Sequence, residues 1–204
     1  MPDQSYALFG GYNSSQIVGG EAGVQTFKNN PGNYKSPIRS WALNTKELLY
    51  NGTSLEKTEG KEEKGQFVKS YPAVIDTGSS FIAVPPEFYG GLKEQWKKSL
   101  SGVDCKTDDT FCQYVGKCTD IAEHLGNVAF NIDDTIFELT PYAYLHQGEV
   151  CQFAIAENPL DSFNNNNFLF GGLFLKHFYT IYDYDNEFIS LGINVHSKHL
   201  VEMH

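Results

Sequence analysis

The stretch Ala73-Val74-Ile75-Asp76-Thr77-Gly78-Ser79-Ser80 places three apolar residues directly before a carboxylate and a hydroxyl-rich turn. The apolar run is typical of a buried strand. The Asp-Thr-Gly-Ser that follows is typical of a tight turn, in which Gly78 is free to adopt backbone angles that other residues avoid. A carboxylate at the end of a buried strand is poorly solvated, so it requires donors such as the turn amides and the hydroxyls of Thr77 and Ser79. An ordinary hairpin turn with an Asx hydrogen bond fits the same four residues, so the tetrapeptide alone leaves both interpretations open.

The composition indicates a folded globular protein rich in strands and turns. The chain has 204 residues, of which 41% are hydrophobic and 14% aromatic, enough for one full core and unlike a disordered chain or a coiled coil. Short apolar runs alternate with 19 glycines and 8 prolines, which favours many short strands. The net charge of -10 and the single arginine, Arg39, argue against nucleic-acid binding and against a phosphate clamp. No apolar run approaches membrane-spanning length.

The cysteines and two sequons favour an oxidising, secretory history. The four cysteines form no pair of metal-type CxxC repeats. Asn13-Ser14-Ser15 and Asn51-Gly52-Thr53 make Asn13 and Asn51 candidate glycosylation acceptors. Met1 is followed by Pro2-Asp3-Gln4, which is no signal peptide, so the start is that expected of an excised piece.

Turn signals and apolar runs predict the order of the elements. Strands are expected at 5–11, 41–50, 66–75, 81–84, 128–132, 135–139, 152–156, 180–184 and 188–191. Pro85-Pro86 begins the strongest helix, with an apolar stripe of Phe88, Leu92 and Trp96 and a terminator at Gly102. Single helical turns are expected at 141–145 and 176–179. Asn51-Gly52 predicts a hairpin.

Three further clusters favour structural interpretations over binding sites. Asp133-Asp134 is interpreted as a hairpin turn rather than a metal site. The mixed-charge run 56–65 is interpreted as a solvated hairpin tip, and 164–167 as a polar loop. The tail histidines are interpreted as a frayed terminus rather than metal ligands: His196, His199 and His204. The sequence therefore predicts neither a metal nor a cofactor.

Taken together, separated pieces of the chain resemble the C-terminal lobe of pepsin-like (family A1) aspartic proteases, in the family's order. The pieces are Leu8-Phe9-Gly10-Gly11-Tyr12-Asn13, the tryptophan strand and hairpin at 41–52, the motif at 73–80, Phe168-Leu169-Phe170-Gly171, the segment 173–183 and the closing strand 188–192. The resemblance covers nearly the whole chain. It implies an all-β fold with a few short helices, one lobe of the pepsin-like double-psi β-barrel. Residues 1–204 would form one domain, with the N-terminal lobe absent.

The resemblance also implies a role for each residue of the motif. Asp76 would be one of two catalytic aspartates that share a proton and activate water. Thr77 would lock the two catalytic loops together across the lobe interface, and Gly78 would bond the substrate backbone. Ser79 would hydrogen-bond the outer oxygen of Asp76 and contribute to substrate binding. Val74 lies two residues before Asp76 on the same strand face, so it is expected to line a side-chain pocket.

Other implied features lie outside the motif. Phe170 and Gly171 would form the psi loop that crosses beneath the catalytic loop. Cys118 and Cys151 match the lobe's usual disulfide, which leaves Cys105 and Cys112 as an extra pair. Gly172 stands where the family commonly has Asp, a change expected to be tolerated. The Asp-Thr-Gly-Ser motif occurs only once in the chain. The absent first lobe would contain the second catalytic aspartate and the flap tyrosine that closes over the substrate.

One aspartate is not enough for this chemistry. Two adjacent carboxylates cannot both ionise, so one can take a proton from water while the other polarises the scissile carbonyl. A lone Asp, with an ordinary pKa of about 3.9, has no reason to be a strong base. The second carboxylate would come from the first lobe of the same protein, from a separate first-lobe chain or, in third place, from a homodimer.

The sequence thus predicts an aspartic-type endopeptidase that is inactive as this chain alone. The expected partners are a peptide or protein substrate and an N-terminal lobe, without nucleic acid or membrane. The expected location is the secretory pathway, a lysosome- or vacuole-like acidic compartment, or the extracellular space. The alternative is a non-catalytic binding or structural module of the same fold. Metal binding by the terminal histidines is a distant third interpretation.

Overall fold

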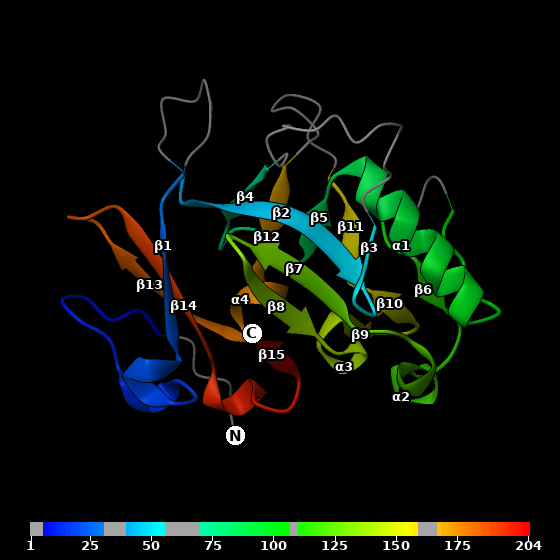
Figure 1. Ribbon diagram of the computed structural model, residues 1–204. Helices are drawn as coiled ribbons and strands as arrows, with labels where there is room; N and C mark the ends of the chain where they lie inside the picture. The colour runs from blue at the N-terminus through cyan, green and yellow to red at the C-terminus, as the bar shows by residue number, and fades with distance from the viewer. Residues whose placement is uncertain (1–5, 31–39, 56–69, 107–109, 159–166) are drawn as a thin grey trace.

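In the computed structural model, residues 6–30, 40–55, 70–106, 110–158 and 167–204 are described (Figure 1). They form a mostly β structure with a few short helices, as predicted. A strongly curved sheet occupies the middle of the molecule, with a three-stranded sheet beside it and α1 along the opposite side (Figure 1). Among these residues, no helix combines the length and the apolar character needed to cross a membrane.

The strands fall into three sheets. The large sheet has the order β11-β5-β12-β4-β2-β7-β8-β15, with β3 also paired to β2; the small sheets have the orders β1-β14-β13 and β6-β10-β9. The strands are β1 Val24–Lys28, β2 Ala42–Tyr50, β3 Thr53–Ser54, β4 Tyr71–Ile75, β5 Ile82–Val84, β6 Gln113–Tyr114, β7 Val128–Ile132, β8 Thr135–Leu139, β9 Leu145–Gln147, β10 Cys151–Phe153, β11 Ile155–Glu157, β12 Phe168–Phe170, β13 Phe178–Asp183, β14 Phe188–Ile193 and β15 Val201–Met203.

The helices are short apart from α1. The α-helices are α1 Pro86–Ser99, α2 Cys118–Ile121, α3 Pro141–Tyr144 and α4 Gly172–Leu175. The 3-10 turns are η1 Ser14–Gln16, η2 Gly20–Gly23, η3 Ala122–His124 and η4 Val195–Ser197. Helix α1 begins at the predicted proline and buries the predicted stripe of Phe88, Leu92 and Trp96. It ends before Gly102, which has a positive φ of 90°.

The connection around β12 defines the topology of the large sheet. β12 pairs in parallel with β4 on one side and antiparallel with β5 on the other, although β4 and β5 are consecutive in the sequence. The short segment between β4 and β5 must therefore pass over the end of β12. That segment contains Asp76.

Aromatic side chains from β7, β12, α4 and β13 fill the core behind this crossing. The rings of Phe170 and Phe174 stack with centroids 4.3 Å apart, and the ring of Phe178 lies 4.5 Å from that of Phe174. Phe130 contacts Phe170 edge-on at 5.1 Å. All four residues are fully buried. Each such aromatic ring contributes several kcal/mol, roughly 3–5 on truncation to alanine, so this cluster fixes the position of β12.

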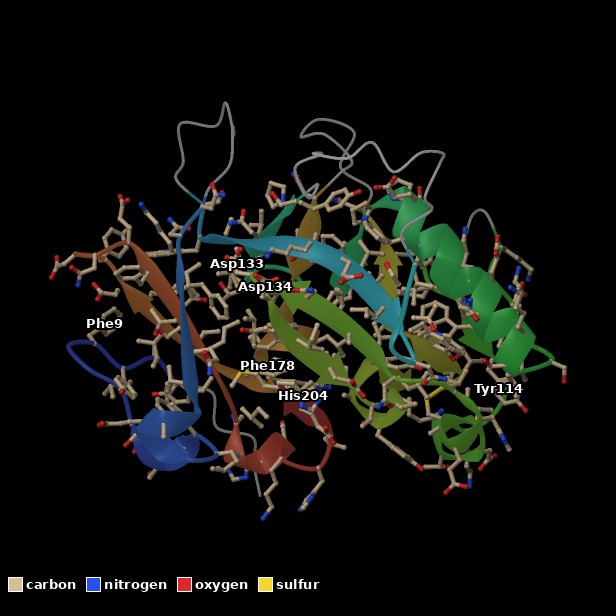
Figure 2. All side chains as sticks on the ribbon, in the orientation of Figure 1. Phe9, Tyr114, Asp133, Asp134, Phe178 and His204 are labelled. Atoms are coloured by element: carbon tan, nitrogen blue, oxygen red, sulfur yellow. A yellow bond between two sulfur atoms is a disulfide. The ribbon has the colours of Figure 1, made fainter. Side chains whose placement is uncertain are left out.

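Both predicted hairpin turns are confirmed. Asn51 and Gly52 have positive φ angles of 49° and 71°, and they join β2 to β3. Asp133 and Asp134, with φ angles of 45° and 71°, join β7 to β8 (Figure 2). Both turns have the left-handed geometry that matches the twist of the flanking strands.

Both disulfides implied by the resemblance are present. Cys118 is bonded to Cys151 and Cys105 to Cys112. The bond between Cys118 and Cys151 ties α2 to β10 across 33 residues, a loop whose closure contributes about 3–4 kcal/mol in the chain-entropy account.

Four predicted elements are wrong in the described residues. Residues 6–11 are not a strand but an exposed irregular segment. The expected helix at 176–179 is replaced by α4, which ends one residue earlier, and by the start of β13. The expected strand 152–156 is two strands, β10 and β11, in different sheets. The tail is not frayed, because β15 pairs with β8. Residue 5 and the predictions for 56–65, 66–69 and 164–166 lie outside the described residues.

A buried histidine, His177, holds the tail against the core. It lies between α4 and β13 and is only 3% exposed. Its Nδ1 lies 2.9 Å from Ser197 Oγ of η4, and its Nε2 lies 3.3 Å from the carbonyl oxygen of Ala143 in α3. Burial, with a smaller contribution from the charge of Lys176, lowers the pKa of His177 to about 4, against the opposing effect of the Ala143 carbonyl.

We therefore expect this chain to lose stability in mild acid. Between pH 6.5 and pH 4 the unfolded chain binds a proton at His177, whose unfolded pKa is near 6.5, whereas the folded chain does not. The free energy of unfolding therefore decreases as the pH falls from about 6.5 to about 4, by about 3 kcal/mol in total. Urea unfolding at pH 7 and pH 4.5 measures the loss. His177→Gln should flatten this dependence, whereas His146→Gln, at an exposed histidine, should leave it unchanged. An equally steep dependence in His177→Gln would contradict the assignment.

Candidate functional site

Asp76 lies immediately after β4, at the point where the chain crosses the end of β12. Its backbone N–H donates to the carbonyl of Phe170, at 3.0 Å, and thereby continues the ladder between β4 and β12 by one residue. The preceding N–H, that of Ile75, donates to the carbonyl of Trp41 at 2.8 Å. The backbone of Asp76 is therefore anchored to the sheet, and its side chain stands at the sheet's end.

The Asp76 carboxylate receives one hydrogen bond on each oxygen. The Gly78 N–H donates to Oδ1 at 2.9 Å, and the Ser79 hydroxyl donates to Oδ2 at 2.7 Å. The carboxylate is half-buried, with Gly78 and Thr77 exposed beside it. Asp76 is thus oriented from within its own turn and remains accessible from outside.

Two details of the turn differ from the prediction. Gly78 does not have a positive φ, so left-handed geometry is not the reason for glycine here. A Cβ at Gly78 would instead lie 3.1 Å from Asp76 Oδ1, so glycine permits the close approach of amide and carboxylate. The Gly78 N–H already donates to Asp76 Oδ1, so the hydrogen bond expected between Gly78 and a substrate backbone would have to use the Gly78 carbonyl. Thr77 was expected to donate to the carboxylate, but the donors in the described residues are Gly78 and Ser79.

The loop carbonyls after Asp76 are held by the start of α4. Gly172 N–H donates to Ser79 O at 2.7 Å, and Leu173 N–H donates to Ser80 O at 3.0 Å. These amides belong to the first turn of a helix and have no partner within it. No local sequence pattern predicts this contact, because it depends on β12 placing α4 next to the loop.

Gly171 is the residue over which the loop crosses. Its N–H donates to the carbonyl of Phe81 at 3.2 Å. A Cβ added to it would lie 2.4 Å from Phe81 O and 2.5 Å from Ser79 O, distances that backbone atoms cannot tolerate. Phe170 beside it is fully buried, so the predicted Phe170-Gly171 pair does lie directly beneath the Asp76 loop.

Val74 lies on the same sheet face as Asp76, as the period of two residues requires. It is half-buried and lies between Ala42 of β2 and Leu169 of β12. Phe81, at the other end of the loop, belongs to the same face and was not predicted as a site residue. Its apolar side chain in a strand pattern gave no signal that distinguished it from the core.

The two sequons lie at exposed turns. Asn13 precedes η1, and its Oδ1 accepts from the Ser15 backbone N–H and hydroxyl at 3.1 and 2.8 Å. Asn51 lies at the tip of the β2–β3 hairpin, where its Oδ1 accepts from the Asn127 N–H at 3.1 Å. Both side chains are exposed, which is compatible with their being glycosylation acceptors.

No metal cluster accompanies Asp76 in the part of the chain that is described. No group of three or more His, Cys, Asp or Glu side chains there is arranged to hold a metal ion. A cavity of about 320 Å³ lies elsewhere, on the three-stranded sheet, and contains none of the predicted site residues; it is lined by Tyr12, Glu21, Val24, Thr26, Ile181, Asp183, Phe188 and Ser190. The Asp76 loop therefore presents a carboxylate that is oriented by its own turn and is partly accessible.

Comparison with known proteins identifies what the chain is similar to. A family model described as eukaryotic aspartyl protease matches residues 2–193. Gastricsin of Homo sapiens is 27% identical over 148 residues, covering 72% of this chain and 36% of that protein. Plasmepsin I of Plasmodium falciparum (isolate 3D7) is 27% identical over 131 residues, covering 62% and 26%. The chain therefore spans about a third of the length of the curated relatives it matches.

A solved structure supports the fold. The aspartic proteinase of Irpex lacteus matches 94% of this chain with a TM-score of 0.67, at 20% sequence identity, and the match covers 52% of that structure's chain. At this identity the likeness concerns the fold alone.

Gly171 and its neighbour Gly172 offer a matched test of the crossing. Gly171→Ala should destabilise the protein by about 1–3 kcal/mol or more, because the new methyl group meets two backbone carbonyls. Gly172→Ala should be close to neutral, since its Cβ would meet Ser79 O at an ordinary 3.5 Å. Urea unfolding of both variants measures the difference. Equal stability of the two would contradict the close crossing.

Proposed function

The chain belongs to the eukaryotic aspartyl protease family, and on that basis we propose that it is the C-terminal lobe of an aspartic-type endopeptidase. Asp76 is the catalytic aspartate that this lobe contributes. The observation that carries the proposal is the orientation of the Asp76 carboxylate by Gly78 N–H and Ser79 Oγ at 2.9 and 2.7 Å, at an accessible surface. A purely structural Asx turn requires no such exposure of the carboxylate.

The chemistry follows from pairing this carboxylate with a second one. Two carboxylates in contact share one proton, because their charges repel. The ionised member takes a proton from water as the water oxygen bonds to the peptide carbonyl carbon, and the protonated member donates to the carbonyl oxygen. The aspartate that took the proton from water then gives it to the nitrogen as the C–N bond breaks. The other aspartate takes back the proton from the former carbonyl oxygen, so the products are a carboxylic acid and an amine and the shared-proton pair is restored.

The surface of this chain supports pairing with another lobe. The N-terminal segment exposes large apolar side chains that a free surface would not favour, with Phe9 92% exposed at one end of the molecule (Figure 2). The other exposed apolar side chains of this segment are Tyr6, Leu8 and Tyr12. In the described residues, the outer edge of β13 in the neighbouring sheet has no strand beside it. An unpaired edge and an apolar patch are both typical of a covered interface.

The length of the relatives supports one source of the second carboxylate. Because the match covers 36% of gastricsin, a relative of that length has room for a further lobe. We therefore place the second aspartate in a first lobe of the same protein, then in a separate first-lobe chain, and last in a homodimer. Thr77, exposed beside Asp76, is the residue through which the two catalytic loops would bond across the interface.

A non-catalytic module of the same fold is the alternative function. Such a module could retain the fold without using the carboxylate. The two hydrogen bonds to Asp76 and its accessible position favour the peptidase, because a binding module has no need of either. Disulfides persist in oxidising compartments, so we place the protein in the secretory pathway, in an acidic compartment or outside the cell.

The proposal is tested on the full-length protein with its first lobe. Asp76→Asn should reduce peptide cleavage at acid pH by at least about a thousandfold, because the neutral amide can neither share the proton nor accept one from water. Asp133→Asn, at a half-buried carboxylate in the β7–β8 turn, is the matched control and should retain full activity. Binding of a statine-type transition-state mimic is the second measurement. If the wild type does not bind the mimic and Asp76→Asn does not change cleavage, the peptidase proposal is refuted.

A further inference from the structure

We propose that Phe81 and Phe111 form an aromatic wall that selects a large apolar side chain of the substrate, about three residues from the cleaved bond. The proposal rests on the proposed endopeptidase function. Neither residue belongs to the Asp-Thr-Gly-Ser motif, and they come from segments 30 residues apart in the sequence.

The first step is the position of Phe81 relative to Asp76. The peptide unit between Phe170 and Gly171 is bonded on both sides: its C=O accepts from Asp76 N–H, and its N–H donates to Phe81 C=O. The two groups of a peptide unit point in opposite directions, so Asp76 and Phe81 flank β12. Adjacent strands lie roughly 4.8 Å apart, which places the two backbones about 10 Å from each other.

The second step is the face of the sheet. Leu169 pairs with both Val74 and Ala83, and none of these three belongs to the main core cluster. Two residues further along each strand, the same row contains Gly171 flanked by Asp76 and Phe81. Because side chains alternate with a period of two, the side chains of Asp76 and Phe81 belong to the same face. The residue between them has no side chain.

The third step is the partner of Phe81. The ring of Phe111 meets the ring of Phe81 edge-on, with centroids 5.1 Å apart and planes at 85°. Both residues are half-buried, so each ring keeps an accessible part. An edge-to-face pair of this kind is itself stabilising and presents a continuous apolar surface.

The fourth step is the rigidity of Phe111. Its neighbour Cys112 is fully buried and disulfide-bonded to Cys105. Asp104 and Gln113 exchange two backbone hydrogen bonds at 2.8 and 2.7 Å, and Cys112 O accepts from Phe153 N–H at 2.9 Å. The extra disulfide thus holds Phe111 in place, and Cys105 and Cys112 are positioning residues.

An extended peptide is the occupant that fits this geometry. An extended chain advances roughly 3.3 Å per residue, so 10 Å corresponds to about three residues. A peptide whose scissile bond lies at Asp76 and which runs across the strand ends toward β5 therefore brings the side chain of its third residue to the wall. Large apolar side chains gain most from such a surface.

The experiment uses the full-length protein with its first lobe and a set of matched peptides. The peptides differ only at the third residue on either side of the cleaved bond, with Phe, Leu or Gly at that position. When the varied residue lies on the side of the cleaved bond that reaches the wall, wild type should cleave the Phe peptide with a kcat/KM about tenfold above that of the Gly peptide. Phe111→Ala should bring that ratio close to one by lowering kcat/KM for the Phe peptide.

Three further variants separate selection from misfolding. Phe111→Leu keeps an apolar side chain and should give an intermediate ratio. Replacement of both Cys105 and Cys112 by Ser should raise KM for the Phe peptide while retaining kcat. Phe188→Ala removes an exposed ring from β14 and should leave the ratio at the wild-type value.

The outcomes distinguish the wall from the peptidase. Cleavage that Asp76→Asn abolishes, together with a Phe-to-Gly ratio that Phe111→Ala leaves unchanged, would overturn the wall and keep the function. A wild-type Phe-to-Gly ratio of kcat/KM near one, whichever side of the cleaved bond carries the varied residue, would also overturn the wall and keep the function. No cleavage of any peptide by wild type would overturn both.

Discussion

The site depends on one peptide unit, the bond between Phe170 and Gly171, which is held on both sides by the chain that crosses over it. Asp76 donates to its carbonyl and Phe81 accepts from its N–H, at 3.0 and 3.2 Å. The aromatic core beneath fixes this unit, because Phe170 and Phe174 stack at 4.3 Å. A small displacement of β12 would therefore move Asp76, the loop after it and Phe81 together.

The orientation of the carboxylate is thus complete without a partner. The donors to Asp76 are Gly78 and Ser79, both within three residues of it, and the loop carbonyls are held by α4. A second lobe would add the second carboxylate and would cover the site, but it would not be needed to orient the Asp76 side chain. This division suits a shared-proton pair, since two rigid half-sites that meet lose little conformational freedom at the interface.

Local signals predicted the parts of the structure that local physics determines. Asn51-Gly52 and Asp133-Asp134 form hairpins because their own backbones favour positive φ, and Pro86 begins α1 because its ring suits a first helical turn. The motif at 73–80 likewise carries its own hydrogen-bond donors. The resemblance to a family supplied the disulfide pairs, which spacing alone leaves undetermined.

The errors arise where a distant segment decides the outcome. The apolar residues at 6–11 have the pattern of a strand, but a strand requires a neighbour, and the described residues provide none. The tail pairs with β8 through backbone groups that its histidine-rich sequence does not reveal. Residues 152–156 divide between two sheets because Ala154 bonds in turn to Tyr144 and Ile82.

Gly78 illustrates the same limit within the motif itself. Its glycine was expected for a special backbone angle, and the reason is instead the space beside the Asp76 carboxylate, 3.1 Å from where a Cβ would lie. Gly171 repeats this logic one strand away, where the obstacle is the carbonyl of Phe81 at 2.4 Å. Both glycines clear room for polar groups around the strand crossing. The absence of side chains at these two positions is what allows an oriented carboxylate to stand at an open surface of a tightly crossed sheet.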